Sequence, residues 1–190
     1  PTPVIGGVGL LDNLDHFSTP SIKRENDNII IIGETKGHLC QSIYAYEIFG
    51  DIKGLPPKVD LLMEKKIGDT VRDLVKKIKI DTVHDISDGG LLIALTEMSI
   101  AGNIGFELNI SQNNLHNGYL FGEDQGRYII LVEDKNLSKT IECIKKNKIS
   151  HSIIGKSCGK KIKIDKNSEV DIEEIRDLYE NWFENYLKVN

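Results

Sequence analysis

The sequence predicts a mixed α/β fold of the α+β kind, with a two-layer mixed sheet and helices packed on it. Runs of β-branched residues, typical of buried strands, alternate along the chain with segments in which apolar residues recur at helical spacing. This interleaving is the pattern of a layered α/β domain. Hydrophobic residues make up 39% and charged residues 28% of the 190 residues, so the chain can bury a core and disorder is not expected.

The first half of the chain predicts one strand and two helices. Four β-branched residues in a row, Ile29 to Ile32, indicate a strand at 28–34 that is buried on both faces. A short helix is expected at 39–49, ended by Gly50, and a break follows at the two prolines 56–57. An amphipathic helix comes next, with an apolar face formed by Ile67, Val71, Leu74, Val75 and Ile78.

The second half predicts five strands and three helices. The strands are expected at 81–84, 104–110, 128–132, 151–158 and 161–165. The helices are expected at 91–100, around Leu137, Ile141 and Ile144, and at 171–187. In the closing helix, Ile172, Ile175, Leu178, Trp182 and Phe183 fall on one side. We expect Trp182 and Phe183 to anchor this helix in the core.

Composition excludes several classes of function. A formal net charge of −5 gives no generic attraction to nucleic acid or to anionic lipid. The apolar runs fall well short of the roughly 18 residues that cross a bilayer. Cys40, Cys143 and Cys158 form no Cys-x-x-Cys pair, which argues against structural zinc and favours a reduced, cytoplasmic setting. Residues 1–9 show no signal-peptide pattern and are interpreted as a hinge between two domains.

The segment from His84 to Gly90 is the first candidate site, because two glycines open a buried helix there. Unpaired N–H groups and a partial positive charge at a helix start can hold a phosphate. Asp85 and Asp88 fit this interpretation if Mg²⁺ bridges their carboxylates and the phosphate oxygens. The alternative is that Ser87 or Asp88 is simply the N-cap, with Asp85 accepting local backbone hydrogen bonds. His84 is expected to orient the loop rather than to act as a base.

The segment from Gly122 to Arg127 is the second candidate site. Glu123, Asp124 and Gln125 offer polar contacts, and Arg127 offers a guanidinium fork for phosphate or carboxylate. The alternative is a β-turn in which Glu123 and Arg127 form a surface ion pair of little energetic value. A third glycine-marked loop, residues 33–38, lacks the P-loop spacing and is interpreted as a turn.

Four motifs, in order, resemble the C-terminal part of the phosphoribosylformylglycinamidine synthase family, synthetase subunit, in its small form. They are residues 1–10 (PTPVIGGVGL), 56–60 (PPKVD), 84–91 (HDISDGGL) and 120–128 (LFGEDQGRY). The resemblance covers essentially the whole chain, and the last two motifs together are specific. It implies the C-terminal-domain fold of the aminoimidazole ribonucleotide synthetase superfamily.

The resemblance also implies a domain organisation. Members of this family consist of two repeats, each an A domain followed by a B domain. Residues 1–28 are then expected to be the tail of the preceding A domain and a linker. Residues 29–190, including the closing helix at 171–187, are expected to be the second B domain.

The activity implied by the resemblance is an ATP-dependent amidation in de novo purine biosynthesis. ATP activates the formamide oxygen of formylglycinamide ribonucleotide, and ammonia made from glutamine displaces phosphate to give the amidine. ATP or ADP and Mg²⁺ are the implied cofactors of the intact enzyme. The implied partners are the missing N-terminal domains of the same chain, a glutaminase subunit and a small accessory subunit, with no nucleic acid and no membrane.

The resemblance assigns roles to residues of both candidate sites. Asp85 matches a metal-binding aspartate of the first B domain, and residues 123–125 match a substrate-binding Glu-Ser-Gln, from which Asp124 departs. Since the catalytic histidines of the family lie upstream, no catalytic residue is expected here and the isolated chain is expected to be inactive. The expected contacts are metal binding by Asp85 and Asp88, and nucleotide or phosphate binding by Ser87, Gly89, Gly90, Glu123, Gln125 and Arg127.

Two other interpretations compete with a part in the catalytic site. The chain could be a non-catalytic structural or auxiliary-nucleotide module of the same enzyme. It could instead belong to another superfamily member, such as a selenophosphate synthetase, a hydrogenase maturation factor or a thiamine-phosphate kinase. In the fragment, the face that contacts the A domain would be left as an exposed apolar patch, so we expect a dimer or concentration-dependent association.

Overall fold

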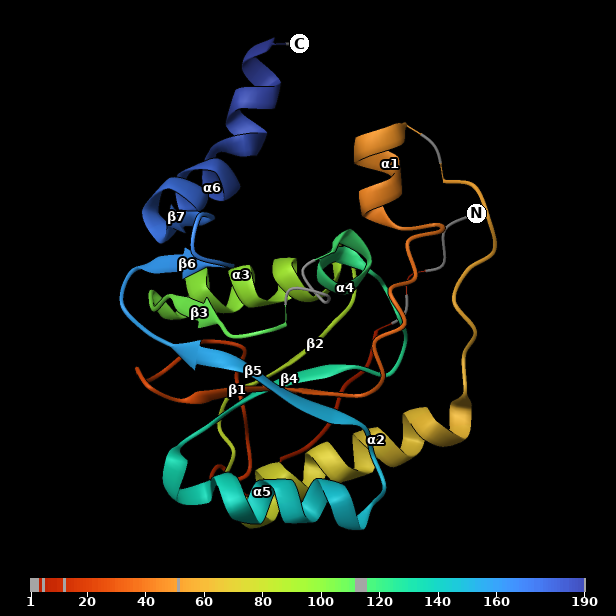
Figure 1. Cartoon of the computed structure of the whole chain (residues 1–190), viewed down its shortest axis with the longest axis vertical. Coiled ribbons are helices and arrows are strands. Elements are labelled where there is room, and N and C mark those ends of the chain that lie inside the picture. The colour runs from red at the N-terminus through yellow and green to blue at the C-terminus, as the bar shows by residue number, and fades with distance from the viewer. Residues whose placement is uncertain (1–3, 5, 12, 51, 112–115, 190) are drawn as a thin grey trace.

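The computed structural model describes residues 4, 6–11, 13–50, 52–111 and 116–189, and it shows a seven-stranded sheet (Figure 1). The strands are β1 (Asn28–Ile32), β2 (Val83–Asp85), β3 (Phe106–Leu108), β4 (Tyr128–Val132), β5 (His151–Ser157), β6 (Lys161–Lys163) and β7 (Glu169–Asp171). They lie in the order β2-β4-β1-β5-β3-β6-β7. The pairing of β3 with β6 is parallel and the other pairings between these strands are antiparallel, so the sheet is mixed as expected.

Helices cover both faces of the sheet (Figure 1). One face carries α3 (Gly90–Gly102), α4 (Asn117–Phe121) and the first turn of α6 (Ile172–Val189). The other face carries α2 (Leu61–Asp73), its π-helical extension η1 (Leu74–Ile78) and α5 (Asp134–Lys146). The short helix α1 (Ile43–Phe49) has no buried residue and stands away from the sheet.

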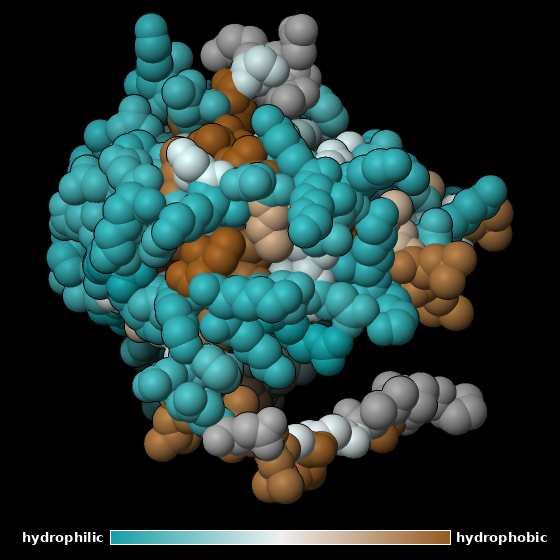
Figure 2. Space-filling view, turned by 90° about the horizontal axis from the view of Figure 1, so that it is seen from below, coloured by the Kyte–Doolittle hydropathy of each residue, from teal (hydrophilic) through white to brown (hydrophobic). Residues whose placement is uncertain are grey.

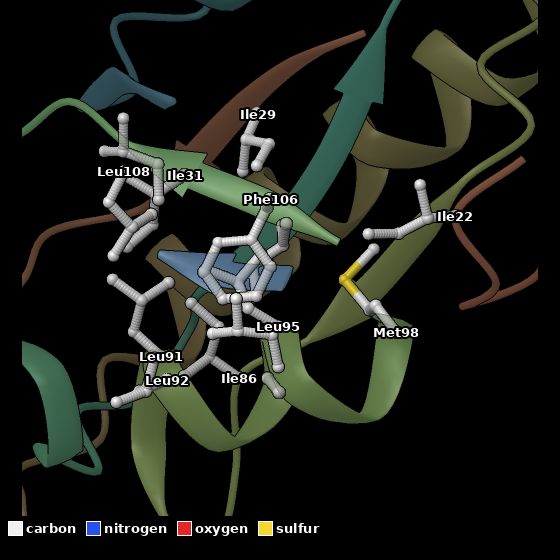
Figure 3. Packing of buried hydrophobic residues seen from close by; sticks show 14 of the residues in the cluster. Ile22, Ile29, Ile31, Ile86, Leu91, Leu92, Leu95, Met98, Phe106 and Leu108 are labelled. Carbon is white, nitrogen blue, oxygen red and sulfur yellow. The ribbon is translucent and has the colours of Figure 1, made fainter. Parts of the chain in front are cut away.

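The isoleucines of β1 explain why helices are needed on both faces. Ile29 and Ile31 pack into the cluster beneath α3 (Figure 3), whereas Ile30 and Ile32 pack into the cluster beneath α2 and α5. Successive side chains of a strand point to opposite faces, and all four are at most 2% exposed. The mixed α/β class is confirmed, but the expected two layers are three, because a strand that is apolar on both faces needs cover on both.

The elements expected from the sequence are present, with boundaries shifted by a few residues. The helix expected at 39–49 begins at Ile43, because the Ser42 hydroxyl caps it, and it ends before Gly50 as predicted. The amphipathic helix begins earlier, at Leu61, because the Asp60 carboxylate accepts hydrogen bonds from the first-turn N–H groups. Two elements, α4 and β7, were not expected, since each is too short to show a periodic pattern.

The prediction that Trp182 and Phe183 anchor α6 in the core is wrong. They are 59% and 55% exposed, and the residues of α6 from Asp177 to Lys188 are all exposed. Only the start of the helix is held, by buried Ile172 and partly buried Ile175. The helical spacing identified an apolar face of α6 correctly, but the described residues leave the second half of that face exposed.

The segment before β1 packs on the domain. Ile22 is 1% exposed and belongs to the core cluster beneath α3. Arg24 donates two hydrogen bonds of 2.8 Å to the Asp81 carboxylate, just before β2. Whether residues 1–28 are the end of a preceding domain and a linker stays a prediction, yet residues 22–27 are part of this packed unit.

No helix in the described part of the chain is long and apolar enough to cross a bilayer. Seen from the side of α2 and α5, the molecule is largely hydrophilic (Figure 2). The three cysteines are free thiols, and Cys40 is exposed.

The central position of β1 predicts a large effect of truncating Ile30, which is 0% exposed. Ile30→Ala removes buried methylenes and leaves a cavity, so it is expected to lower the free energy of unfolding by about 2–5 kcal/mol. The matched change Ile48→Ala, at a position that is 59% exposed in α1, is expected to stay within about 0.5 kcal/mol. Urea denaturation of the two variants checks this, and equal losses would contradict the assigned burial.

The contact between Arg24 and Asp81 predicts an acid dependence. Hydrogen bonds from Arg24 hold the pKa of Asp81 below its ordinary value. Because the folded pKa is depressed, the stabilisation is fully present above the unfolded pKa of about 3.9 and is lost as the pH falls through the folded value.

Asp81→Asn is therefore expected to lower Tm at neutral pH, with a difference from wild type that shrinks below about pH 4. Thermal melts across this pH range check the prediction, with Asp88→Asn, an exposed residue, as the control. A difference that stayed constant down to about pH 3 would count against the contact.

Candidate functional site

Strand register brings the three glycine-marked loops to one end of the sheet. Ile32 of β1 and Asp85 of β2 both lie opposite Tyr128 of β4. The loop that leaves β1, the loop that leaves β2 and the loop that enters β4 therefore emerge together. The sequence singled out all three loops but did not predict that they meet.

Glu123 joins the second candidate segment to the first. One oxygen of its carboxylate, Oε1, accepts hydrogen bonds from the N–H of Gly89 at 2.8 Å and from the N–H of Ile43 at 2.9 Å. These groups lie at the starts of α3 and α1, where N–H groups lack a partner within the helix. The anion predicted at the start of α3 is thus present as a protein carboxylate, and it also ties α1 to the domain.

The start of α3 contradicts the simple N-cap alternative. Its N-cap residue is Gly89, in the left-handed region with φ of 76°, and no side chain of the cap residue bonds to the helix. Ser87 and Asp88 are exposed and do not cap it. Gly90 is needed for packing as well, because a Cβ on it would lie 2.6 Å from the carbonyl carbon of Phe121.

Asp124 organises the third loop, which the sequence analysis had interpreted as a plain turn. Its carboxylate accepts hydrogen bonds from three consecutive N–H groups, those of Lys36 and Gly37 at 2.9 Å and that of His38 at 3.3 Å. The Asp124 side chain is buried at 6% exposure. Successive N–H groups that converge in this way form an anion-binding nest, which this carboxylate fills.

Arg127 lies beneath these loops and is 1% exposed. Its guanidinium donates to the carbonyl oxygens of Asp124 and Gly122 and to the hydroxyl of Thr35. Burial lowers the pKa of Arg127, and the nearby Asp124 carboxylate partly offsets this effect. The alternative of a surface ion pair between Glu123 and Arg127 is wrong, and the Arg127 donors serve internal acceptors, so its predicted contact with a ligand is not supported by its position.

Asp85 and Asp88, the predicted metal ligands, are both exposed. His84 lies between two carboxylates, with Nδ1 at 3.3 Å from Asp85 and Nε2 at 3.3 Å from Glu97 of α3. In the described part of the chain no group of three or more His, Cys, Asp or Glu side chains is arranged to hold a metal. Mg²⁺ in nucleotide sites uses one or two carboxylates together with phosphate oxygens, so the two aspartates fit such a site only with a bound nucleotide.

A groove of about 460 Å³ opens beside the joined loops. Its apolar lining comes from the segment before α2 and from α2 itself, namely Leu55, Pro56, Pro57, Met63 and Ile67. Its polar lining comes from the loops after β1 and before β4 and from residues around the start of α2, namely Glu34, Lys36, His38, Lys58, Asp60, Glu64, Asp124, Gln125 and Gly126. A volume of this size with mixed lining is typical of small-molecule sites.

Among the residues predicted to bind a ligand, Gln125 is the one that lines this groove, and it is exposed. Its side chain makes no hydrogen bond within the described residues. Asp85 lies near the same end, because it stands opposite Tyr128 in the register of β2 and β4. Burial, followed by the charges of Glu64 and Asp85, raises the pKa of Tyr128. Gln125, Asp85 and Asp88 are therefore exposed to solvent, whereas Glu123, Asp124 and Arg127 hold the loops in place.

Comparison with known proteins places residues 24–166 in the family model described as AIR synthase related protein, C-terminal domain. The chain is 42% identical over 188 residues to the phosphoribosylformylglycinamidine synthase subunit PurL of Rhodopseudomonas palustris strain HaA2. That match covers 98% of this chain and 26% of the relative. The PurL subunit of Bartonella tribocorum is 40% identical over 187 residues, 98% of this chain and 25% of the relative. The chain thus spans about a quarter of the length of these relatives.

Solved structures of similar fold include PurL of Thermotoga maritima in complex with FGAR. It matches with a TM-score of 0.69 and 17% identity over 86% of this chain and 30% of that chain. A hydrogenase maturation protein, HypE, matches with a TM-score of 0.51 and 16% identity over 74% of this chain and 46% of that chain. At these identities the structural matches support the fold alone.

The nest around Asp124 predicts a stability effect. Asp124→Asn keeps the shape of the side chain but removes the charge and one of the two oxygen acceptors that serve the N–H groups of residues 36–38. Because these hydrogen bonds are only partly buried, it is expected to lower the free energy of unfolding by about 1 kcal/mol. Asp88→Asn, at an exposed site, is expected to change it by less than about 0.5 kcal/mol. Urea denaturation measures the free energy of unfolding of both variants, and hydrogen exchange measures the protection of the amides of residues 36–38. Unchanged exchange in Asp124→Asn would contradict the role of Asp124 as acceptor for these amides.

Proposed function

Because the chain belongs to the AIR synthase related family, as its C-terminal domain, we propose that it serves as the C-terminal domain of a phosphoribosylformylglycinamidine synthase. The observation that carries this proposal is the 42% identity to a PurL subunit over 98% of the chain. The reaction proposed for the whole protein is the ATP-dependent amidation of formylglycinamide ribonucleotide in purine biosynthesis. One of the alternatives considered from sequence, a hydrogenase maturation protein, shares the fold at 16% identity, which is weaker support than the identity to PurL.

In the proposed reaction, ATP phosphorylates the formamide oxygen, ammonia from glutamine adds to the carbon, and phosphate leaves to give the amidine. ATP or ADP and Mg²⁺ are the proposed cofactors of the whole protein. Solved relatives are titled as complexes with ATP, ADP and AMPPCP, which supports the nucleotide. Within this chain, Asp85 and Asp88 would be the metal-facing carboxylates, and Mg²⁺ when bound would offset phosphate charge.

The proposed role of this chain is to provide one wall of a site that other domains complete. The groove beside the three loops supplies an apolar surface with a polar rim, and Gln125 is free to hydrogen-bond a ligand. At the start of α3, Ser87 is exposed and is proposed to contact a ligand, whereas the N–H of Gly89 is bonded to Glu123 and that of Gly90 to the Ser87 carbonyl, so the predicted contacts of these two glycines are not part of the proposal. No residue is assigned a catalytic role, so the isolated chain is proposed to be inactive.

Partners and setting follow from the same relationship. Since the relatives are about four times as long as this chain, the proposed partners include the remaining domains of the same polypeptide. A structure titled PurLQS from Thermotoga maritima supports a complex with further subunits, and we propose a glutaminase subunit and a small accessory subunit. The proposed setting is the cytoplasm.

A second candidate function is a non-catalytic structural or auxiliary-nucleotide module of the same enzyme. The observation that favours it is that Glu123, Asp124 and Arg127 all use their polar groups on internal hydrogen bonds. Such a module would keep the loops rigid without touching the reacting atoms.

A chimera tests the proposed function. The matching quarter of the Rhodopseudomonas palustris PurL subunit is replaced by this chain, and ATP- and ammonia-dependent formation of the amidine is measured. Retained turnover is expected, because 98% of the chain aligns with that subunit. A soluble, folded chimera without activity would count against the proposal.

Asp85→Asn in the active chimera separates the two candidate functions. If Asp85 faces a metal-bound nucleotide, the variant is expected to lose about tenfold or more in kcat/KM and to require more Mg²⁺. The matched change Asp165→Asn, in the turn between β6 and β7, is expected to leave both unchanged. Turnover of Asp85→Asn equal to that of the parent chimera would favour the non-catalytic module.

A further inference from the structure

Two helices project from the side of the sheet that carries α3 and α4. Figure 1 shows α1 above α4, and the second half of α6 rising above α3 on the same side. Seen from the opposite side, that of α2 and α5, the molecule is largely hydrophilic (Figure 2). The exposed apolar side chains of these two helices therefore distinguish one side of the domain from the other.

Helix α6 is supported over its first turn only. Ile172 is buried and Ile175 packs against the core. Arg176 donates a hydrogen bond to the carbonyl of Ile100 in α3. Beyond it the residues from Asp177 to Lys188 are all exposed, and a helical segment of this length is marginal in water without tertiary packing. Six large apolar side chains of this segment are between 55% and 68% exposed, namely Leu178, Tyr179, Trp182, Phe183, Tyr186 and Leu187.

Helix α1 is held on one side and bare on another. The ring of Tyr44 stacks on that of Phe121 in α4, with centroids 5.1 Å apart. A stripe of apolar residues with a spacing of three turns away from Tyr44. Its members are 47%, 57% and 71% exposed, namely Ile43, Tyr46 and Phe49. The helix is thus fixed in place, but its outer face has no cover among the described residues.

The nine exposed side chains of α1 and α6 together approach the size of an interface between domains. At about 200 Å² for each side chain and about 60% exposure, they present roughly 1,000 Å². Interfaces between domains of one chain bury about 600–1,500 Å². A body of domain size that reaches both helices would therefore account for the exposed area.

The comparisons favour the rest of the same polypeptide as this body. The match to the AIR synthase related model ends at residue 166, before α6 begins. The alignment with the Rhodopseudomonas palustris PurL subunit covers 98% of the chain, so it includes most of α6, and that subunit is about four times as long. A helix that lies outside the common domain but inside the alignment with the longer protein is expected to find its cover in that protein.

A second copy of the chain would compete poorly with such a cover. A domain joined to the same chain meets this surface at an effective concentration in the millimolar range. A second copy must in addition lose the translational and rotational freedom of a separate molecule. The covalently joined domain is therefore the stronger competitor for the same side chains.

We propose that the exposed apolar residues of α1 and of the second half of α6, which together we call the docking face, bind the rest of the same polypeptide. The domain that docks there carries a complementary apolar surface wide enough to contact both helices. This inference rests on the proposed function only in requiring that the chain is part of a longer protein of this family.

The docking face borders the candidate site. One carboxylate oxygen of Glu123 accepts hydrogen bonds from the N–H groups of Ile43 and Gly89, so the starts of α1 and α3 are neighbours. Ser87 and Asp88 are exposed just before α3. A domain seated on α1 comes close to these two side chains, which fits a site that another domain completes.

Hydrogen exchange in the chimera tests the docking face. The chimera carries this chain in place of the matching quarter of the Rhodopseudomonas palustris PurL subunit, and the isolated chain at low micromolar concentration is the reference. Peptides covering residues 43–49 and 178–187 are expected to exchange at least about tenfold more slowly in the chimera, whereas peptides from α5 exchange alike in both proteins. Protection of neither segment, or of one alone, would overturn the proposal.

A concentration series distinguishes the joined domain from a second copy. Protection of the docking face in the chimera is expected to be independent of concentration, because the cover belongs to the same chain. Sedimentation velocity is run on the same samples. Protection that appears only at high concentration, together with a doubled mass, would assign the cover to a second copy and overturn the proposal.

Matched variants locate the contact. Trp182→Ser in α6 and Leu62→Ser in α2 change side chains that are 59% and 84% exposed. In the isolated chain both are expected to leave the melting temperature unchanged. In the chimera only Trp182→Ser is expected to lower it and to speed exchange at residues 178–187. Equal effects of the two changes in the chimera would count against the docking face.

Turnover of the same chimera separates this proposal from the proposed function. An active chimera with an unprotected docking face would overturn the docking and leave the proposed function standing. A folded, inactive chimera in which both segments are protected would support the docking and count against the proposed function.

Discussion

The register of three neighbouring strands determines the arrangement of the whole functional end of the sheet. Ile32 of β1 and Asp85 of β2 lie opposite the same residue of β4, Tyr128. This register is strongly specified, because a slip of one residue would move the buried isoleucines of β1 to the wrong faces. The packing of an entirely apolar strand between two helical layers therefore fixes where three polar loops emerge.

Five backbone N–H groups of the segments that meet there donate to carboxylate side chains rather than to carbonyl groups. A buried N–H without an acceptor is costly, and the structure meets this need with two adjacent carboxylates. Glu123 accepts at the starts of α3 and α1, and Asp124 accepts from residues 36–38. Arg127 binds the carbonyl groups of the same turn from below. One acidic dipeptide thus gives the groove a rigid wall and leaves Gln125 free.

The sequence indicated the fold class and most elements because periodicity and glycine signals are local. It also drew attention to the segments 84–90 and 122–127. It did not reveal that Glu123 bonds to Gly89, 34 residues away, or that Asp124 bonds to Lys36, 88 residues away. An acid next to a glycine loop is consistent with metal binding, with capping of the same helix and with capping of a distant loop. Only tertiary structure selects among these.

The same reasoning explains why α6 was misjudged. An apolar stripe on a helix predicts that this face of the helix is buried, but it does not predict which element covers the face. The stripe that contains buried Ile172 and partly buried Ile175 continues through Leu178 and Trp182, which are 68% and 59% exposed. The start of the helix is held by these isoleucines and by Arg176, which donates a hydrogen bond to the carbonyl of Ile100 in α3. Periodicity therefore identified the apolar face of α6, but how much of that face the described residues cover depends on where α3 lies, which is not a local property of the sequence.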